Sequence, residues 1–175
     1  MTSELVNLAE LRIINKDYQG TLDAVMPSVH ARWGYAPVYP LAVLCMIKLR
    51  RLIEARELLR DTWATACEFP SSYGLRAYLY RLRGHADSAA WSEQQCELLC
   101  LQRGRTIGSG LELMAEVYLE VGDSAALSAA RRAVAENPEY STYRILLGRA
   151  LLQAGREDEA GKEFATSLRL NPDAA

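Results

Sequence analysis

The dipeptide Asn-Pro occurs twice near the end of the chain, at Asn137-Pro138 and Asn171-Pro172, and the two copies are 34 residues apart. Apolar, small and glycine residues recur at matching positions between them. This interval is typical of a repeated helix-turn-helix unit. One such unit cannot cover its own apolar face, so units stack and bury a continuous core. The feature therefore predicts an all-α chain built from stacked helix pairs.

The two clearest units carry one shared pattern of small and large apolar residues. The later unit has Leu147-Gly148, Leu151, Gly155, Ala160, Phe164 and Pro172, and the earlier one has Leu111, Met114-Ala115, Tyr118, Gly122, Ala126, Ala130, Ala133 and Pro138. This pattern resembles the tetratricopeptide repeat family, whose units place small residues where two helices touch and a glycine in the turn. The resemblance implies a right-handed superhelical solenoid.

The same spacing extends towards the N-terminus in a less regular form. Gly84 marks the turn of a third unit, Arg50-Arg51 stands in place of the turn glycine in a second, and Lys16-Asp17-Tyr18 occupies the turn of a first. Arg76 and Glu93 fall where apolar residues usually lie in such a unit. We expect one domain of about five units, at 2–33, 36–69, 71–102, 108–139 and 141–172, with loops at 33–37 and at about 102–110.

Composition argues against several classes of function. The 20 basic and 22 acidic residues give a formal net charge of −2, without the basic bias that attracts nucleic acid. The chain contains no apolar stretch of the roughly 20 residues that span a bilayer, and its first residues do not have the pattern of a secretory leader. We therefore expect a soluble, cytoplasmic protein that neither inserts into a membrane nor binds nucleic acid.

The residues that usually carry chemistry are few and scattered. Cys96 and Cys100 share a helix face, but two thiols lack the further ligands of a zinc site, and His30 and His85 have no metal-binding spacing. Together with Cys45 and Cys67, these cysteines are expected to be reduced thiols. We expect no catalytic residue, no cofactor and no metal, and so no enzyme.

Ser109 lies between Gly108 and Gly110, but the Gly-x-Ser-x-Gly pattern of a nucleophile turn is absent. We expect Ser109 to cap the helix that follows. Arg103 and Arg105 lie near this helix start, where an anion could bind, although the Gly-Lys-Ser/Thr ending of a phosphate loop is missing.

The resemblance to tetratricopeptide repeats implies that a partner binds on the concave face, which the first helix of each unit lines. Carried over to this sequence, the expected contact residues are Leu44, Tyr73, Tyr78, Arg81, Glu112, Glu116, Arg149 and Gln153. The Lys and Asn clamp that some family members use to bind chaperone carboxylates is missing. For Tyr78 a core position is an equal alternative, the charged residues could simply be solvated, and Tyr80 and Tyr118 are expected in the core.

The expected function is a noncatalytic scaffold, chaperone or adaptor that binds a protein or peptide segment in the concave groove. Two alternatives remain open. The chain could be an accessory domain of a larger enzyme or of an envelope or secretion assembly protein. It could also be a structural module that forms homo-oligomers, because no further polar helix covers the last repeat.

Overall fold

The computed structural model describes residues 2–31, 38–64 and 69–171, and the helices within these ranges form one all-α solenoid without strands. The expected loop at 33–37, Cys67 and Pro172 lie outside the described residues. The helices are α1 (Thr2–Ile14), α2 (Tyr18–His30), α3 (Val38–Lys48), α4 (Leu52–Ala64), α5 (Pro70–Arg81), α6 (Ala86–Gln102), α7 (Ile107–Val121), α8 (Ala125–Glu136), α9 (Ser141–Gln153) and α10 (Glu157–Leu170).

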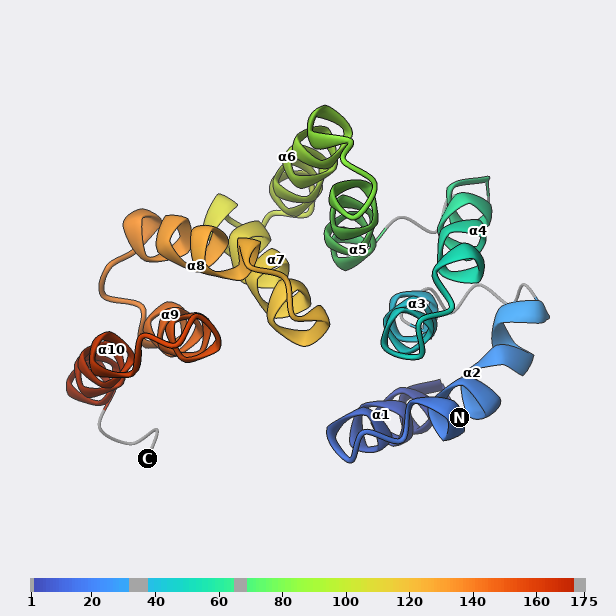
Figure 1. The fold of residues 1–175 in the computed structure, drawn as a ribbon, viewed down its shortest axis with the longest axis horizontal. Helices are drawn as coiled ribbons and strands as arrows, with labels where there is room; N and C mark the ends of the chain where they lie inside the picture. The colour runs from blue at the N-terminus through green and yellow to red at the C-terminus, as the bar shows by residue number, and fades with distance from the viewer. Residues whose placement is uncertain (1, 32–37, 65–68, 172–175) are drawn as a thin grey trace.

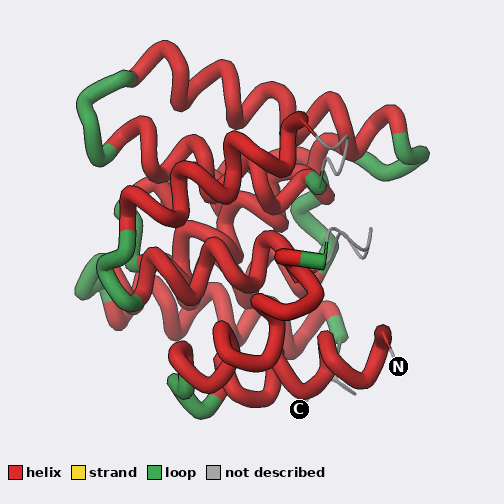
Figure 2. The backbone as a smooth tube through the Cα atoms, turned by 90° about the vertical axis from the view of Figure 1, so that its right-hand side faces the viewer, coloured by secondary structure: helices red, strands yellow, loops and turns green. Residues whose placement is uncertain are grey.

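The helices form five pairs that follow one another along an arc (Figure 1). The odd-numbered helices contact one another in series, from α1 to α3, α5, α7 and α9. The described even-numbered helices contact only odd-numbered ones, and α4, α6, α8 and α10 lie on the outer side of the arc. Figure 2 shows the helices running side by side across the molecule, with loops at its edges. The predicted solenoid is confirmed, and its concave side is formed by the odd-numbered helices.

The turns within the pairs require a left-handed backbone. Gly84, Gly122 and Gly155 have φ angles of 76°, 78° and 72°, which glycine adopts without steric cost. Lys16 and Arg50 occupy the corresponding turns of the first two pairs with φ angles of 61° and 62°. The prediction that Lys16 and Arg50 lie where the other turns have a glycine is therefore confirmed. The left-handed conformation strains the backbone at these two residues.

Small residues allow the helices of a pair to approach closely. Ala115, Ala126 and Ala160 are fully or almost fully buried, and Gly148 of α9 faces the ring of Phe164 on α10. A methyl group placed on Gly148 would lie 2.7 Å from Cζ of Phe164, too close for ordinary contact. The ring therefore fills the space that the glycine leaves.

The expected loop at about 102–110 is too long, because α7 already begins at Ile107. Its N-cap is Thr106, whose Oγ1 accepts a hydrogen bond from the backbone N–H of Ser109 at 3.1 Å, so the assignment of Ser109 as the cap is wrong. The neighbouring glycines serve helix packing: a Cβ on Gly110 would lie 2.9 Å from Cα of Glu97 on α6. Gly108 likewise leaves room for the ring of Tyr143 on α9.

Candidate partner-binding surface

The residues expected on the concave face come from four odd-numbered helices. Their positions are Leu44 on α3, Tyr73, Tyr78 and Arg81 on α5, Glu112 and Glu116 on α7, and Arg149 and Gln153 on α9. The side chains differ widely in exposure, and this difference separates residues that can meet a partner from residues that hold the solenoid together.

The middle of the concave face is filled by apolar side chains. Tyr78 is only 8% exposed, Ile47 is 3% exposed, and Leu44 is half-buried against the same core. The cause is the tight arc, since α3 contacts both α5 and α7. Tyr78 therefore packs in the core, and substitution by a charged residue there would disturb the fold before it tested binding.

Tyr73 lies on a different side of α5. Its ring packs edge-on against Trp91 of α6 with 6.3 Å between centroids, and the Arg76 guanidinium lies 5.2 Å from its centroid. The residue is buried. Its surroundings are those of a side chain that joins α5 to α6.

Arg81 is the centre of a polar junction between three segments. Its Nε and Nη2 donate to Oδ2 of Asp123 at 2.9 and 2.6 Å, and Nη1 donates to Glu93. The guanidinium lies 4.3 Å from the centroid of the Tyr118 ring, and the Tyr118 hydroxyl donates to Glu93 at 2.8 Å. This junction explains why Glu93 replaces the usual apolar residue.

The surroundings of the junction change the acidity of its members. Burial acts to lower the pKa of Arg81, but Tyr118 and Asp123 outweigh it and raise that pKa. Burial raises the pKa of Tyr118, and the nearby Glu93 carboxylate adds to the increase. The guanidinium therefore stays charged and the phenol neutral, as the hydrogen bonds require.

Three carboxylates form a single face on α7, and we call Glu112, Glu116 and Glu120 the acidic face. They are four residues apart, which places them on one side of the helix. Burial raises the pKa of Glu112, although Arg105 opposes the increase. Burial also raises the pKa of Glu116, with a further contribution from Glu112. Glu112 and Glu120 are half-buried and Glu116 is exposed, so the carboxylates are partly desolvated but open to a partner.

Two side chains of α9 border the acidic face. Arg149 lies 3.6 Å from a carboxylate oxygen of Glu120 and is largely exposed. Its charge also opposes the increase in the pKa of Glu116. Gln153 is exposed and donates to the backbone carbonyl of Asp123 at 3.3 Å. Sequence reasoning missed Glu120, although its spacing from Glu116 repeats the spacing between Glu112 and Glu116.

Within residues 2–31, 38–64 and 69–171, no cluster of three His, Cys, Asp or Glu side chains is arranged to hold a metal ion. Cys45, Cys96 and Cys100 are buried free thiols. Burial raises the pKa of Cys45 to about 11. A hydrogen bond with Cys100, together with burial, raises the pKa of Cys96. The same hydrogen bond lowers the pKa of Cys100 to about 7, with Arg105 and Arg103 adding to the decrease. Cys45 and Cys96 therefore pack as small apolar side chains.

No helix in the described part of the chain is both long enough and apolar enough to cross a bilayer. The described helices form a helical-repeat solenoid, and Glu112, Glu116 and Glu120 share one side of its helix α7.

Comparisons with known proteins agree with this class. The tetratricopeptide repeat pattern matches residues 124–175. The fold is similar to a crystal structure of MamA protein, at 16% identity and a TM-score of 0.50, covering 98% of this chain and 92% of that one. It is also similar to the nearly identical tetratricopeptide-like repeats of a putative kinesin light chain from Podosopora anserina, at 15% identity and a TM-score of 0.52, covering 98% and 95% of the two chains. No curated protein matches the sequence. The resemblance to tetratricopeptide repeat proteins is confirmed.

Proposed function

We propose that the chain is a noncatalytic scaffold that binds a partner polypeptide on the acidic face of α7, beside Arg149 and Gln153. The observation that carries this proposal is the placement of three carboxylates on one side of α7, with Arg149 3.6 Å from Glu120; the raised pKa of Glu112 and Glu116 supports it. Like charges held close together in a partly buried place cost free energy, and a cationic group from a partner relieves this cost.

The chemistry of the surface indicates the partner. Lys and Arg side chains donate charge-assisted hydrogen bonds to carboxylates, and these are stronger than bonds between neutral groups. The three carboxylates span nine residues of α7, a rise of about 12 Å from Glu112 to Glu120. This length fits a short peptide segment that carries two or more basic side chains. Because Leu44 and Tyr78 pack in the core, they support the surface from behind instead of contacting the partner.

A chaperone or adaptor role follows from this form of binding. A surface that binds a short basic segment can shield that segment from other contacts. It can also hold the partner protein near a second protein. Neither role requires the chain to perform chemistry. The partner is therefore expected to leave unchanged after release.

The experiment is affinity capture from an extract of the native cells, followed by mass spectrometry. We would compare the unmodified protein with the double variant Glu112→Gln and Glu116→Gln. The matched control is Glu136→Gln with Glu139→Gln, which removes the same charge from two exposed positions at the end of α8 and the turn after it. Circular dichroism would establish that all three forms fold.

We expect one basic partner to be captured by the unmodified protein and the control, and lost from the Glu112/Glu116 variant. Equal capture by all three folded forms would contradict the assignment of the acidic face.

Self-association is a second candidate, supported by exposed apolar side chains on the last helix pair. Leu152 and Leu168 are each 49% exposed and Leu170 is 39% exposed. Exposed apolar surface of this kind is typical of a protein interface when it forms a patch. Light scattering at high protein concentration tests the candidate, because a monomer that does not change with concentration would contradict it.

A further inference from the structure

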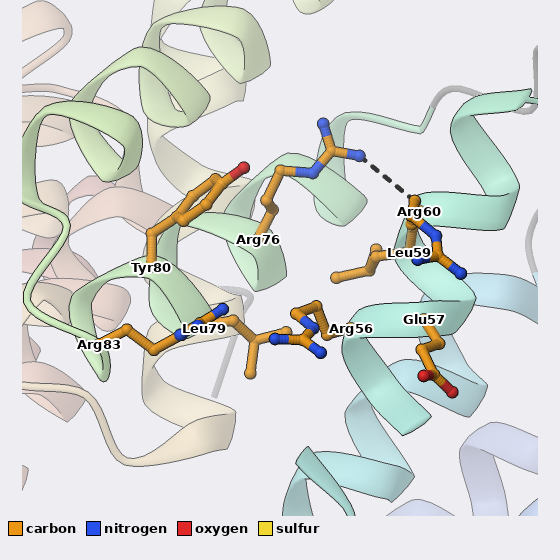
Figure 3. Close-up of a pocket in the computed structure, with 8 residues that line it drawn as sticks. All are labelled: Arg56, Glu57, Leu59, Arg60, Arg76, Leu79, Tyr80 and Arg83. Atoms are coloured by element: carbon orange, nitrogen blue, oxygen red, sulfur yellow. Dashed lines mark hydrogen bonds between the residues drawn. The ribbon is translucent and has the colours of Figure 1, made fainter. Parts of the chain in front are cut away.

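A groove runs between α4 and α5, on the other side of α5 from the partner-binding surface (Figure 3). Its larger part has a volume of about 270 Å³ and its smaller part about 200 Å³. The two parts share Arg56, Leu79 and Arg83, so they form one continuous depression, which we call the α4–α5 groove.

The two walls of the groove carry the same sign of charge. Arg56 and Arg60 project from α4, Arg76 projects from α5, and Arg83 projects from the turn that follows α5. Among the described residues that line this space Glu57 is the one acidic residue, and Figure 3 shows it pointing away from the other side chains. Like charges on facing helices oppose close packing. A hydrogen bond nevertheless joins the two walls, from Nη2 of Arg76 to the backbone carbonyl of Leu59 at 3.4 Å.

The floor and the smaller end of the groove are apolar. Leu59 and Leu79 are 3% and 8% exposed at the floor, beside the half-buried ring of Tyr80. Ile53 and Leu82 border the smaller end and are 67% and 50% exposed. The groove thus combines apolar side chains with a cationic rim, in a chain whose formal net charge is −2.

The groove is separate from the acidic face of α7. Gly74 and Arg81 point towards the α7 side of α5, where a Cβ on Gly74 would lie 3.4 Å from Val117. With 3.6 residues per turn, Arg76 and Leu79 lie on the opposite face of α5, and Arg83 follows in the turn after this helix. A change in one surface therefore need not alter the other.

We propose that the α4–α5 groove binds an acidic amphipathic helix of a partner protein. From Leu52 to Arg60 the wall of α4 rises about 12 Å, which is a little over two helical turns. A helix of that length places two apolar side chains, at i and i+4, against Leu59 and Leu79. Asp or Glu residues beside them meet the arginines of the two walls. A bare anion would satisfy the rim but would leave Ile53 and Leu82 exposed to water.

The test uses a fluorescent peptide of about twelve residues, enough for three helical turns, with a stripe of Leu on a background of Glu. One control peptide replaces Leu by Ser and a second replaces Glu by Lys. Fluorescence anisotropy would measure binding to the unmodified protein and to the double variant Arg56→Glu and Arg83→Glu. The matched protein control is Arg131→Glu with Arg169→Glu, at two exposed positions on α8 and α10.

We expect the Glu/Leu peptide to bind the unmodified protein and the control, and to bind the Arg56/Arg83 variant more than about tenfold more weakly. Binding should also weaken as salt rises, because exposed charges are screened. The variant Ile53→Ser with Leu82→Ser keeps every charge and changes only exposed side chains, so weaker binding to it would support the apolar part of the proposal. The Glu112→Gln and Glu116→Gln variant should bind as well as the unmodified protein.

Three results would overturn the proposal. The first is equal binding of the Glu/Leu and Glu/Ser peptides, or complete displacement by inorganic phosphate, since either would define a simple anion site. The second is unchanged binding to a folded Arg56/Arg83 variant. The third is self-association of the unmodified protein that this variant abolishes, which would assign the groove to a second copy of the chain.

Discussion

Gly148 and Gly161 allow the packing between α9 and α10 to be measured with one kind of substitution. Replacing either glycine by alanine within a helix favours the folded state by about 0.8–1.0 kcal/mol through helix propensity. At Gly161 nothing lies within 4 Å of the added methyl group. At Gly148 the methyl group would lie 2.7 and 2.8 Å from two ring carbons of Phe164. The ring must move, and overpacking of this kind costs about 1–3 kcal/mol.

The two substitutions should therefore have different effects on stability. Gly161→Ala should raise the free energy of unfolding by about 1 kcal/mol. Gly148→Ala should lower it by up to about 2 kcal/mol, once the overpacking cost is set against the propensity gain. Because propensity contributes equally to both, the difference between the variants isolates the contact with Phe164.

Urea denaturation followed by circular dichroism measures this difference. Combining Gly148→Ala with Phe164→Leu should recover part of the loss, because a smaller side chain leaves room for the methyl group. Equal stability of the Gly148→Ala and Gly161→Ala variants would refute the argument that the glycine is needed for close approach of the helices.

Three further predictions concern single regions of the chain. Arg81→Met should lower the free energy of unfolding by about 2–4 kcal/mol in urea denaturation, because the Asp123 carboxylate would lose its cation at a mostly buried site. A loss below about 0.5 kcal/mol, the usual range for an exposed residue, would contradict the stabilising role of the Arg81 junction. Glu112→Gln with Glu116→Gln should raise stability at neutral pH, as thermal melting across a pH series would show. Both carboxyls have a folded-state pKa above the ordinary 4.5, so the folded protein binds more protons than the unfolded chain does between these two values. Its stability therefore falls as the pH rises from 4.5 through the folded-state pKa. A pH profile of the variant identical to that of the unmodified protein would count against the burial of these two carboxyls. Lys16→Gly should stabilise the protein by up to about 1 kcal/mol, because glycine adopts the left-handed turn without strain, and destabilisation in calorimetry would contradict the role of that turn.

Much of the fold could be predicted because the repeat is recognised from the spacing of residues that are close in sequence. The interval between the Asn-Pro pairs and the turn positions at Arg50 and Gly84 depend on residues close in sequence. The start of α7 could not be located in this way, since Gly108 and Gly110 break helical propensity. Glycine is needed at these two helical positions because α6 and α9 pack closely against them. These contacts exist only in the folded structure.

The candidate site was harder to predict because it depends on the curvature of the stack. The spacing predicts Tyr78 on the concave face, but its side chain is only 8% exposed on α5, a helix that contacts both α3 and α7. Arg81 donates a hydrogen bond to Asp123, which lies 42 residues further along the chain, and local spacing does not predict such a distant contact. Arg76, at a position that is usually apolar, is the sequence feature that points to the α4–α5 groove. The groove itself could not be predicted from it, because the facing arginines of α4 are brought near only by the fold.

The most direct test of the proposed function is photo-cross-linking in an extract of the native cells, with a photoreactive residue at position 153. Gln153 is exposed at the border of the acidic face, and Glu136 provides a control position that is exposed on α8. The proposal predicts one cross-linked partner from position 153, absent from position 136 and lost when Glu112 and Glu116 are replaced by Gln. No partner at position 153, or the same partner from both positions, would contradict it.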